Sequence, residues 1–231
     1  SAIKKRLDIP IIWGGTHPTI MPDECLDVVN MVCISEGDDT LSTLLAKIVK
    51  KDNDYSGIPN LYYRKNGKIH RNELKQFDRM DDIPIPDYDL EDHFVLFGNR
   101  IHKMTTDLFR CFYGETYETF CTFGCPFGCA YCCNNTYNKM FKFKIRKRKM
   151  EKIIDELKYI KNKFPFMNRV RIGDDLFFSC YSKDEFEYFG KEYKKHINLP
   201  MAVVGGHPNT IKKDILKICV DAGMDEIGMG I

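Results

Sequence analysis

The stretch CPFGCAYC at residues 125–132 places Cys125, Cys129 and Cys132 in one short segment. Its proline and glycine are typical of a loop. Three thiolates so close together can surround one metal centre, and soft sulfur ligands select zinc, copper(I) or an iron–sulfur cluster. A closed zinc site needs a fourth protein ligand. Cys121 and Cys133 are available for that role, although Cys133 directly follows a ligand and is expected to point away.

The composition is that of a globular protein without a membrane segment. The 231 residues, 43% of them hydrophobic, suffice for one large domain or two smaller ones. A net charge of +2, from 35 basic and 33 acidic residues, gives no support for a nucleic-acid partner. No apolar run is long enough to cross a bilayer and no signal peptide is visible. Three of ten cysteines share one loop without secretory context, which favours a reduced, cytoplasmic protein with a metal site.

The region after the cysteine loop alternates between strand and helix patterns. A strand is predicted to lead into the loop at residues 118–122, and Thr210 and Gly223 are expected to cap the last helix at its two ends. Three strand–helix pairs followed by a strand predict a parallel sheet built from βαβ units. The remaining predicted strands are 170–175, 201–204 and 225–230, and the predicted helices are 153–163, 184–195 and 211–221.

The first 55 residues predict half of a doubly wound α/β domain. Apolar strands are expected at 9–13 and 28–34, the first ending at Gly14-Gly15 and the second at Glu36-Gly37. Both turns should therefore lie at the same edge of the sheet. Residues 16–18 are expected to form a loop and residues 23–26 a helical turn. Thr40 is expected to be the N-cap of the helix that follows the second strand, because apolar residues recur there at helical spacing.

A hairpin and a stiff linker are predicted between the two α/β parts. Asn66-Gly67 separates two alternating segments, which is a strong hairpin signal. Pro84 and Pro86 keep the following residues extended. We therefore divide the chain into residues 1–55, a hairpin and linker at 56–108, and a second domain at 109–231.

The cysteine spacing, with Tyr131 just before the third cysteine, resembles the signature of the radical S-adenosylmethionine (SAM) enzymes. The resemblance implies that Cys125, Cys129 and Cys132 hold three irons of a [4Fe–4S] cluster, and that SAM binds the fourth. It implies cleavage of SAM to methionine and a 5′-deoxyadenosyl radical, an organic substrate, and a reducing partner such as flavodoxin or ferredoxin. The family core is a partial, TIM-barrel-like (β/α) barrel of six strands, of which about four are expected here.

The N-terminal segment resembles the C-terminal half of the Rossmann-like cobalamin-binding domain that precedes many radical SAM cores. The resemblance rests on the Gly14-Gly15-x-His17-Pro18 segment, on Pro22-x-Glu24 and on Glu36-Gly37. It implies that Gly14, Gly15, Glu36 and Gly37 contact the nucleotide tail of cobalamin, whereas His17 is expected to be a loop residue without cobalt ligation. The expected fold is thus half of a cobalamin-binding domain followed by a partial radical SAM barrel, truncated at both ends.

Polar residues near the cysteine loop are further site candidates. Gly173, Asp174 and Asp175 end a predicted strand, and active sites of such folds collect at the carboxyl ends of strands. With Tyr131, they are the SAM contacts that the resemblance implies, although Asp175 fits a helix N-cap nearly as well. The basic run that includes Arg146 and Arg148 has two interpretations. It is either the solvated start of a helix or a patch for an acidic cofactor group or substrate.

The expected activity is that of a cobalamin-dependent methyltransferase or a related enzyme that functionalises C–H bonds, such as a cyclase. The substrate and the catalytic residues are not indicated by the sequence. A radical SAM methylthiotransferase is an alternative, but Cys25 and Cys33 are too isolated to supply the additional cluster of that class. A zinc or electron-transfer module is the non-enzymatic alternative. Stoichiometric zinc without an iron–sulfur chromophore would distinguish it.

Overall fold

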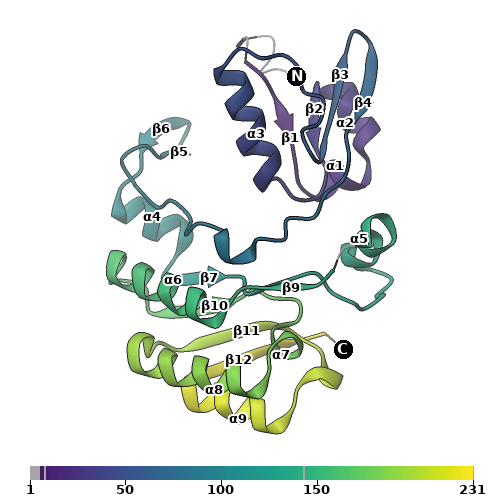
Figure 1. Ribbon diagram of the computed structural model, residues 1–231. Coiled ribbons are helices and arrows are strands. Elements are labelled where there is room, and N and C mark those ends of the chain that lie inside the picture. The colour runs from purple at the N-terminus through teal and green to yellow at the C-terminus, as the bar shows by residue number, and fades with distance from the viewer. Residues whose placement is uncertain (1–5, 8, 143, 231) are drawn as a thin grey trace. The chain divides into compact units, whose positions relative to one another are not determined.

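The computed structural model describes residues 6–7, 9–142 and 144–230. The chain forms two compact units. The first contains residues 1–78 together with 126–143, and the second contains residues 79–125 together with 144–231 (Figure 1). The segment with Cys129 and Cys132 therefore belongs to the first unit, although in the sequence it lies between two parts of the second unit.

The first unit contains a four-stranded sheet in the order β1-β2-β3-β4. β1 (Ile12–Trp13) and β2 (Met31–Cys33) are parallel, and Ile12 pairs with Met31. β3 (Leu61–Lys65) and β4 (Lys68–Arg71) continue the sheet in antiparallel order. Asn66 and Gly67 have φ values of 52° and 74°, as a tight hairpin turn requires. The predicted hairpin is confirmed, and it extends the sheet beyond β2.

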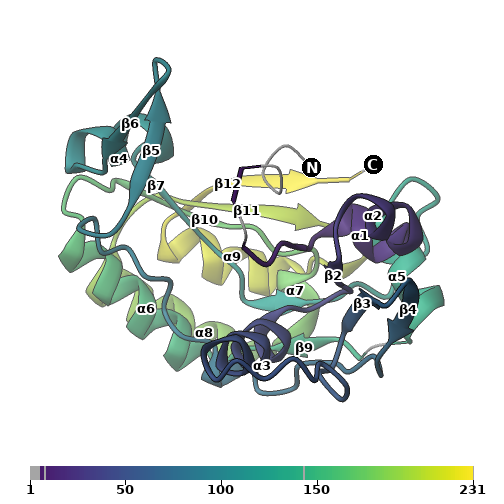
Figure 2. The same ribbon diagram turned by 90° about the horizontal axis from the view of Figure 1, so that it is seen from above.

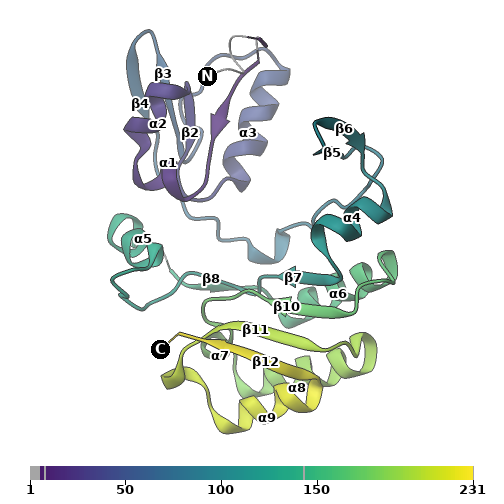
Figure 3. The ribbon, with the colours of Figure 1, turned by 180° about the vertical axis from the view of Figure 1, so that it is seen from behind.

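Helices cover both faces of this sheet. α1 (Thr16–Ile20) and α2 (Pro22–Val28) lie on one side and α3 (Asp38–Val49) on the other (Figure 3). Successive residues of β2 point into different cores, because Val32 packs with Cys25 and Leu26 whereas Met31 packs with Leu44. This is the layered arrangement that the apolar pattern predicts. The last helix of the unit, α5 (Cys133–Phe141), contributes Phe141 to the Val32 core.

Two local predictions in the first unit are wrong. Residues 16–18 form the start of α1 rather than a loop, since a proline is tolerated in the first turn of a helix. Thr40 is not an N-cap, because α3 already begins at Asp38, where two acidic residues favour a helix N-terminus. The Thr40 hydroxyl instead donates to the carbonyl of Pro59 at 2.7 Å, and it ties α3 to the start of the hairpin.

The second unit is built on a parallel sheet in the order β12-β11-β10-β7, whose neighbours all run parallel. Helices α6, α8 and α9 connect its strands and form a layer beneath it (Figure 2). The predicted βαβ series is confirmed. The edge strands do not pair with each other in the described part, so the sheet is open. The bounds are β7 Thr116–Thr119, α6 Met150–Lys163, β10 Arg169–Ile172, α8 Lys183–Glu192, β11 Met201–Gly206, α9 Lys213–Ala222 and β12 Met224–Met229.

Shorter elements complete the second unit. They are the helical turn η1 (Met80–Asp82), the hairpin β5 (Phe94–Phe97) and β6 (Arg100–Lys103), helix α4 (Thr106–Tyr113), the strand pair β8 (Thr122–Phe123) and β9 (Arg146–Lys147), helix α7 (Phe177–Cys180), the π-helical turn η2 (Tyr193–Ile197) and the turn η3 (Pro208–Thr210). Thr210 is not the cap of α9, because it ends η3 and its hydroxyl donates to the carbonyl of His207. Gly223 does end α9, with a φ of 122°. In the described ranges, no helix has both the length and the apolar character needed to cross a bilayer.

Candidate functional site

The three cysteines of the loop are divided between the two compact units. Cys125 lies in the second unit, and Cys129 and Cys132 lie in the first. The backbone N–H of Cys132 donates to the carbonyl of Cys129 at 3.1 Å, and this turn leads into α5. All three thiols are partly exposed, and Tyr131 between them is 85% exposed. Accessible thiols have the donor chemistry that an iron–sulfur cluster needs, but the described residues contain no group of three or more acidic, His or Cys side chains gathered as a metal site.

The two neighbouring cysteines differ from the loop cysteines in their surroundings. Cys121 is completely buried. Burial, with the nearby Asp174 carboxyl as a second cause, raises the pKa of its thiol well above the usual value. Its complete burial sets Cys121 apart from the partly exposed cysteines of the loop. Cys133 is exposed and is the first residue of α5.

The two adjacent aspartates after β10 have opposite environments. Asp174 is 1% exposed, and its Oδ1 accepts a hydrogen bond from the backbone N–H of Cys121 at 2.6 Å. Burial raises the pKa of the Asp174 carboxyl to about 6, although the backbone hydrogen bond from Cys121 acts in the other direction. Asp175 is exposed. It is not a helix N-cap, because α7 begins at Phe177 after Leu176.

Glycines allow the carboxyl ends of the parallel strands to pack closely. A Cβ on Gly173 would lie 2.6 Å from Oε1 of Glu118 and 2.9 Å from the Phe120 ring. A Cβ on Gly205 would lie 2.0 Å from the carbonyl oxygen of Asp174, and the φ of Gly205 is 88°. The predicted strand ends at residue 204, but β11 continues through Gly206. A glycine pair within a strand, rather than after it, is a signal of such close approach.

The basic run after the loop contains a buried ion pair. Arg148 Nη2 lies 2.5 Å from Oε2 of Glu156, and both side chains are almost fully buried. The hydroxyls of Tyr117 and Thr119 donate to Oε1 of the same carboxylate. Arg148 is therefore neither part of a solvated helix start nor free to bind an acidic ligand. The sequence signal was Glu156 itself, because it lies within the apolar stripe of α6 and a buried carboxylate needs a cation.

The glycine turns of the first unit lie together at one edge of the sheet, as predicted. β1 and β2 are parallel, and a Cβ on Gly14 would be 3.7 Å from Cβ of Cys33. Gly15 precedes α1 with a φ of 103°, and Gly37 precedes α3. The Glu36 carboxylate accepts the N–H of Phe77 at 2.6 Å, so this side chain holds the segment that follows the hairpin.

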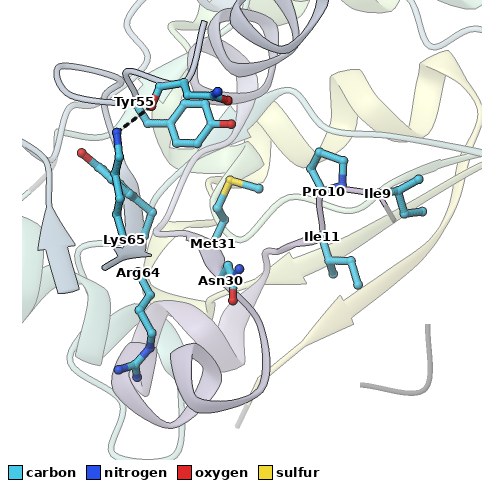
Figure 4. A pocket seen from close by; sticks show the side chains of 10 residues that line it. Ile9, Pro10, Ile11, Asn30, Met31, Tyr55, Arg64 and Lys65 are labelled. Carbon is cyan, nitrogen blue, oxygen red and sulfur yellow. Dashed lines mark hydrogen bonds between the residues drawn. The ribbon is translucent and has the colours of Figure 1, made fainter. Parts of the chain in front are cut away.

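His17 lies in α1 rather than in a loop, and its ring is 5.5 Å from that of Trp13. A separate pocket of about 460 Å³ is lined in part by Ile11, Met31 and Tyr55 (Figure 4). The Lys65 ammonium at its wall donates to a backbone carbonyl at 3.1 Å. The pocket lies at the amino ends of β1 and β2, whereas the glycine turns follow their carboxyl ends. None of the predicted site residues lines it.

The first strand of the parallel sheet, β7, therefore leads through β8 into the segment that carries the three cysteines. Residues 119–231 match the family model described as the Radical SAM superfamily. The match includes the whole cysteine motif. A comparison with curated protein sequences found no match.

Solved structures of two cobalamin-dependent or cobalamin-bound radical SAM proteins are similar to the whole chain. The cobalamin-dependent SAM radical enzyme OxsB, with aqua-cobalamin and SAM bound, has a TM-score of 0.71 at 16% identity, over 100% of this chain and 32% of OxsB. The radical SAM methyltransferase TsrM from Kitasatospora setae, with cobalamin and a [4Fe–4S] cluster bound, has a TM-score of 0.70 at 16% identity, over 99% of this chain and 43% of TsrM. The chain thus spans about a third to less than half of these proteins, and identities this low establish the fold alone.

Proposed function

We propose that the chain is part of a cobalamin-dependent radical SAM enzyme, either a methyltransferase or a related enzyme that functionalises C–H bonds. The observation that carries the proposal is the position of the cysteine motif. It lies within the region that matches the superfamily, on the connection that follows the first strand of the parallel sheet. Active sites of β/α folds collect at the carboxyl ends of such strands.

Cys125, Cys129 and Cys132 would hold the cluster as thiolates. When bound and reduced, the cluster supplies the electron that cleaves SAM to methionine and a 5′-deoxyadenosyl radical. Tyr131, Gly173 and Asp175 are proposed contacts of SAM. The burial of Asp174 favours a supporting role for that residue through the backbone of Cys121. The proposal includes an organic substrate and an external electron donor such as flavodoxin or ferredoxin.

Cobalamin is proposed to bind at the glycine turns of the first unit. Gly14, Gly15 and Gly37 leave the backbone open at one sheet edge, where a parallel sheet binds its ligands. Glu36 would act through its backbone, because its carboxylate is already bound to Phe77. The likeness to OxsB, whose structure contains aqua-cobalamin, supports this part of the proposal.

Anaerobic reconstitution with iron and sulfide tests the cluster. We expect a brown protein that cleaves SAM, and we expect Cys125→Ala, Cys129→Ala and Cys132→Ala each to lose the chromophore and the cleavage. Cys133→Ala is the control and should keep both, because its thiol directly follows a ligand and lies on α5. Stoichiometric zinc without a chromophore would contradict the proposal and favour a zinc module.

Equilibrium dialysis with hydroxocobalamin tests the second cofactor, using the complete reading frame that contains this sequence. Gly14→Ala is the informative variant, because its Cβ meets only an ordinary contact with Cys33 and the fold should tolerate it. We expect weaker retention of cobalamin with unchanged stability. Gly15 is less suitable, since its φ of 103° strains any other residue. Retention by the unmodified protein no greater than that of an unrelated protein would overturn the cobalamin assignment and leave the cluster assignment standing.

A further inference from the structure

The loop that carries the cysteines leaves the second unit through a narrow pair of strands. Thr122 pairs with Lys147 and Phe123 with Arg146, so that β8 and β9 run antiparallel. The N–H of Arg148 donates to the carbonyl of Cys121 at 2.8 Å and extends the pairing by one step. We call residues 121–123 and 146–148 the neck. A ladder this short is marginal by itself, so the neck needs support from outside.

Tyr181 bridges the two strands of the neck. Its hydroxyl lies 2.9 Å from the carbonyl oxygen of Cys121 and 2.9 Å from that of Arg148, and a hydroxyl has one hydrogen to share between them. Its side chain is 8% exposed, and its ring packs against Phe177 and Phe186 in the main core. The bridge therefore connects the neck to a rigid part of the unit.

Asp174 holds the same residue of the neck, Cys121, through its other backbone polar group. Its Oδ1 accepts a hydrogen bond from the N–H of Cys121, and Tyr181 donates one to the C=O of Cys121. Both backbone polar groups of Cys121 are therefore fixed. Its Oδ2 is buried and has no hydrogen-bond partner among the described residues. A buried carboxylate with an unused oxygen costs free energy, so packing alone does not explain an aspartate here.

Lys147 adds a third attachment. Its ammonium lies 4.8 Å above the Tyr181 ring and 2.7 Å from Oε1 of Glu185, the residue that closes the capping box of α8. The second strand of the neck is thus tied to the helix that follows Tyr181. Two side chains from beyond β10, those of Tyr181 and Asp174, therefore bond backbone groups of the neck, and the Lys147 contacts add a third attachment. This convergence indicates a built support rather than a chance contact.

We infer that Tyr181 and Asp174 are positioning residues that lock the neck and so set the position of Cys125 for its metal centre. Cys125 follows the last paired residue, Phe123, by two positions, so the register of the neck decides where its thiolate lies. The nature of the metal centre rests on the proposed function, whereas the lock is a property of the neck itself. Loss of residues that orient metal ligands typically costs about 10- to 100-fold in metal affinity.

The test compares Tyr181→Phe with Tyr193→Phe in the reconstituted protein. Tyr193 is a matched control, because it is buried in the same unit and its hydroxyl also donates to a backbone carbonyl, that of Leu199 at 3.0 Å. Amide hydrogen exchange reports on the neck, and anaerobic release of iron to a chelator reports on the cluster. We expect Tyr181→Phe to speed exchange of the Arg148 amide about 5- to 10-fold and iron release about 10-fold. Tyr193→Phe should change neither rate.

A second pair of variants tests Asp174 by the same two measurements. Asp174→Asn keeps an acceptor for the N–H of Cys121, so amide exchange and iron release should both stay slow. In Asp174→Ala this acceptor is gone, and both rates should increase. This pair decides the matter if Tyr181→Phe does not fold. Equal iron release from Tyr181→Phe and Tyr193→Phe would overturn the inference. A wild-type protein that takes up no iron would overturn the proposed function instead, and the exchange rates would still show whether the lock exists.

Discussion

Replacing Asp174 by asparagine should stabilise the protein at neutral pH but not in mild acid. The carboxyl lies in the interior of the second unit, at 1% exposure. Burial raises its pKa from 3.8 to about 6, because the charged form loses its contact with water. Asparagine has the same shape, carries no charge, and can still accept the N–H of Cys121.

The sign of the effect follows from proton linkage. Between pH 4 and 6 the folded protein keeps the Asp174 proton while the unfolded chain releases it, so rising pH favours unfolding in this window. Each unit of pKa difference corresponds to about 1.4 kcal/mol. Holding the charged Asp174 in the folded protein at neutral pH therefore costs about 3 kcal/mol. We expect the stability of Asp174→Asn relative to wild type to rise by up to that amount between pH 4 and 7.

Urea unfolding of both proteins at pH 4, 5, 6 and 7, followed by circular dichroism, measures this difference. Using the difference between variants removes the contributions of the other titrating groups, which both proteins share. Asp175→Asn, the same substitution at the exposed neighbour, controls for the general effect of removing a negative charge from this segment. A difference that stays flat across the range, or that falls as pH rises, would refute the assignment of Asp174 as a carboxyl destabilised by burial.

Two further predictions concern the interior of the second unit. Glu156→Gln should lower the free energy of unfolding by about 3–5 kcal/mol, because it leaves the buried Arg148 charge without its partner; Glu187→Gln, in an exposed pair, should cost less than about 1 kcal/mol in the same urea titration. Gly205→Ala should cost about 3 kcal/mol or more, since its Cβ would collide with the Asp174 carbonyl. Gly98→Ala, also at positive φ but with open space around its Cβ, should cost only about 1 kcal/mol of thermal or urea stability, and equal losses would contradict the collision.

The repeating architecture could be predicted because its signal is local. Apolar residues recur with the period of a strand or a helix, and Ile153, Leu157 and Ile160 are buried on α6 as their spacing indicates. The Asn66-Gly67 turn is equally local, because the backbone of a tight hairpin selects those residues. These features depend on a few neighbouring positions and not on distant parts of the chain.

The roles of individual polar residues could not be predicted in the same way. Thr40 and Thr210 both have the type of side chain that caps helices. The Thr40 hydroxyl instead donates to the carbonyl of Pro59, which is distant in sequence, and the Thr210 hydroxyl donates to the carbonyl of His207 in the preceding turn. Arg148 lies in a basic run whose composition predicts exposure to solvent. Its burial depends on Glu156 from the next helix, and only the packing of α6 against β7 reveals the pair.

The proposed metal ligands could be predicted from local sequence, whereas the residues that support them could not. Residue type and spacing identify Cys125, Cys129 and Cys132, because the chemistry of a thiolate site is carried by the ligands themselves. The residues that hold Cys121 lie 53 and 60 positions further along the chain. They reach it because the carboxyl ends of neighbouring parallel strands lie side by side, so the segment after β10 meets the segment after β7. In a β/α chain of this kind, the supports of a loop that follows one strand should therefore be sought after the next strand of the sheet.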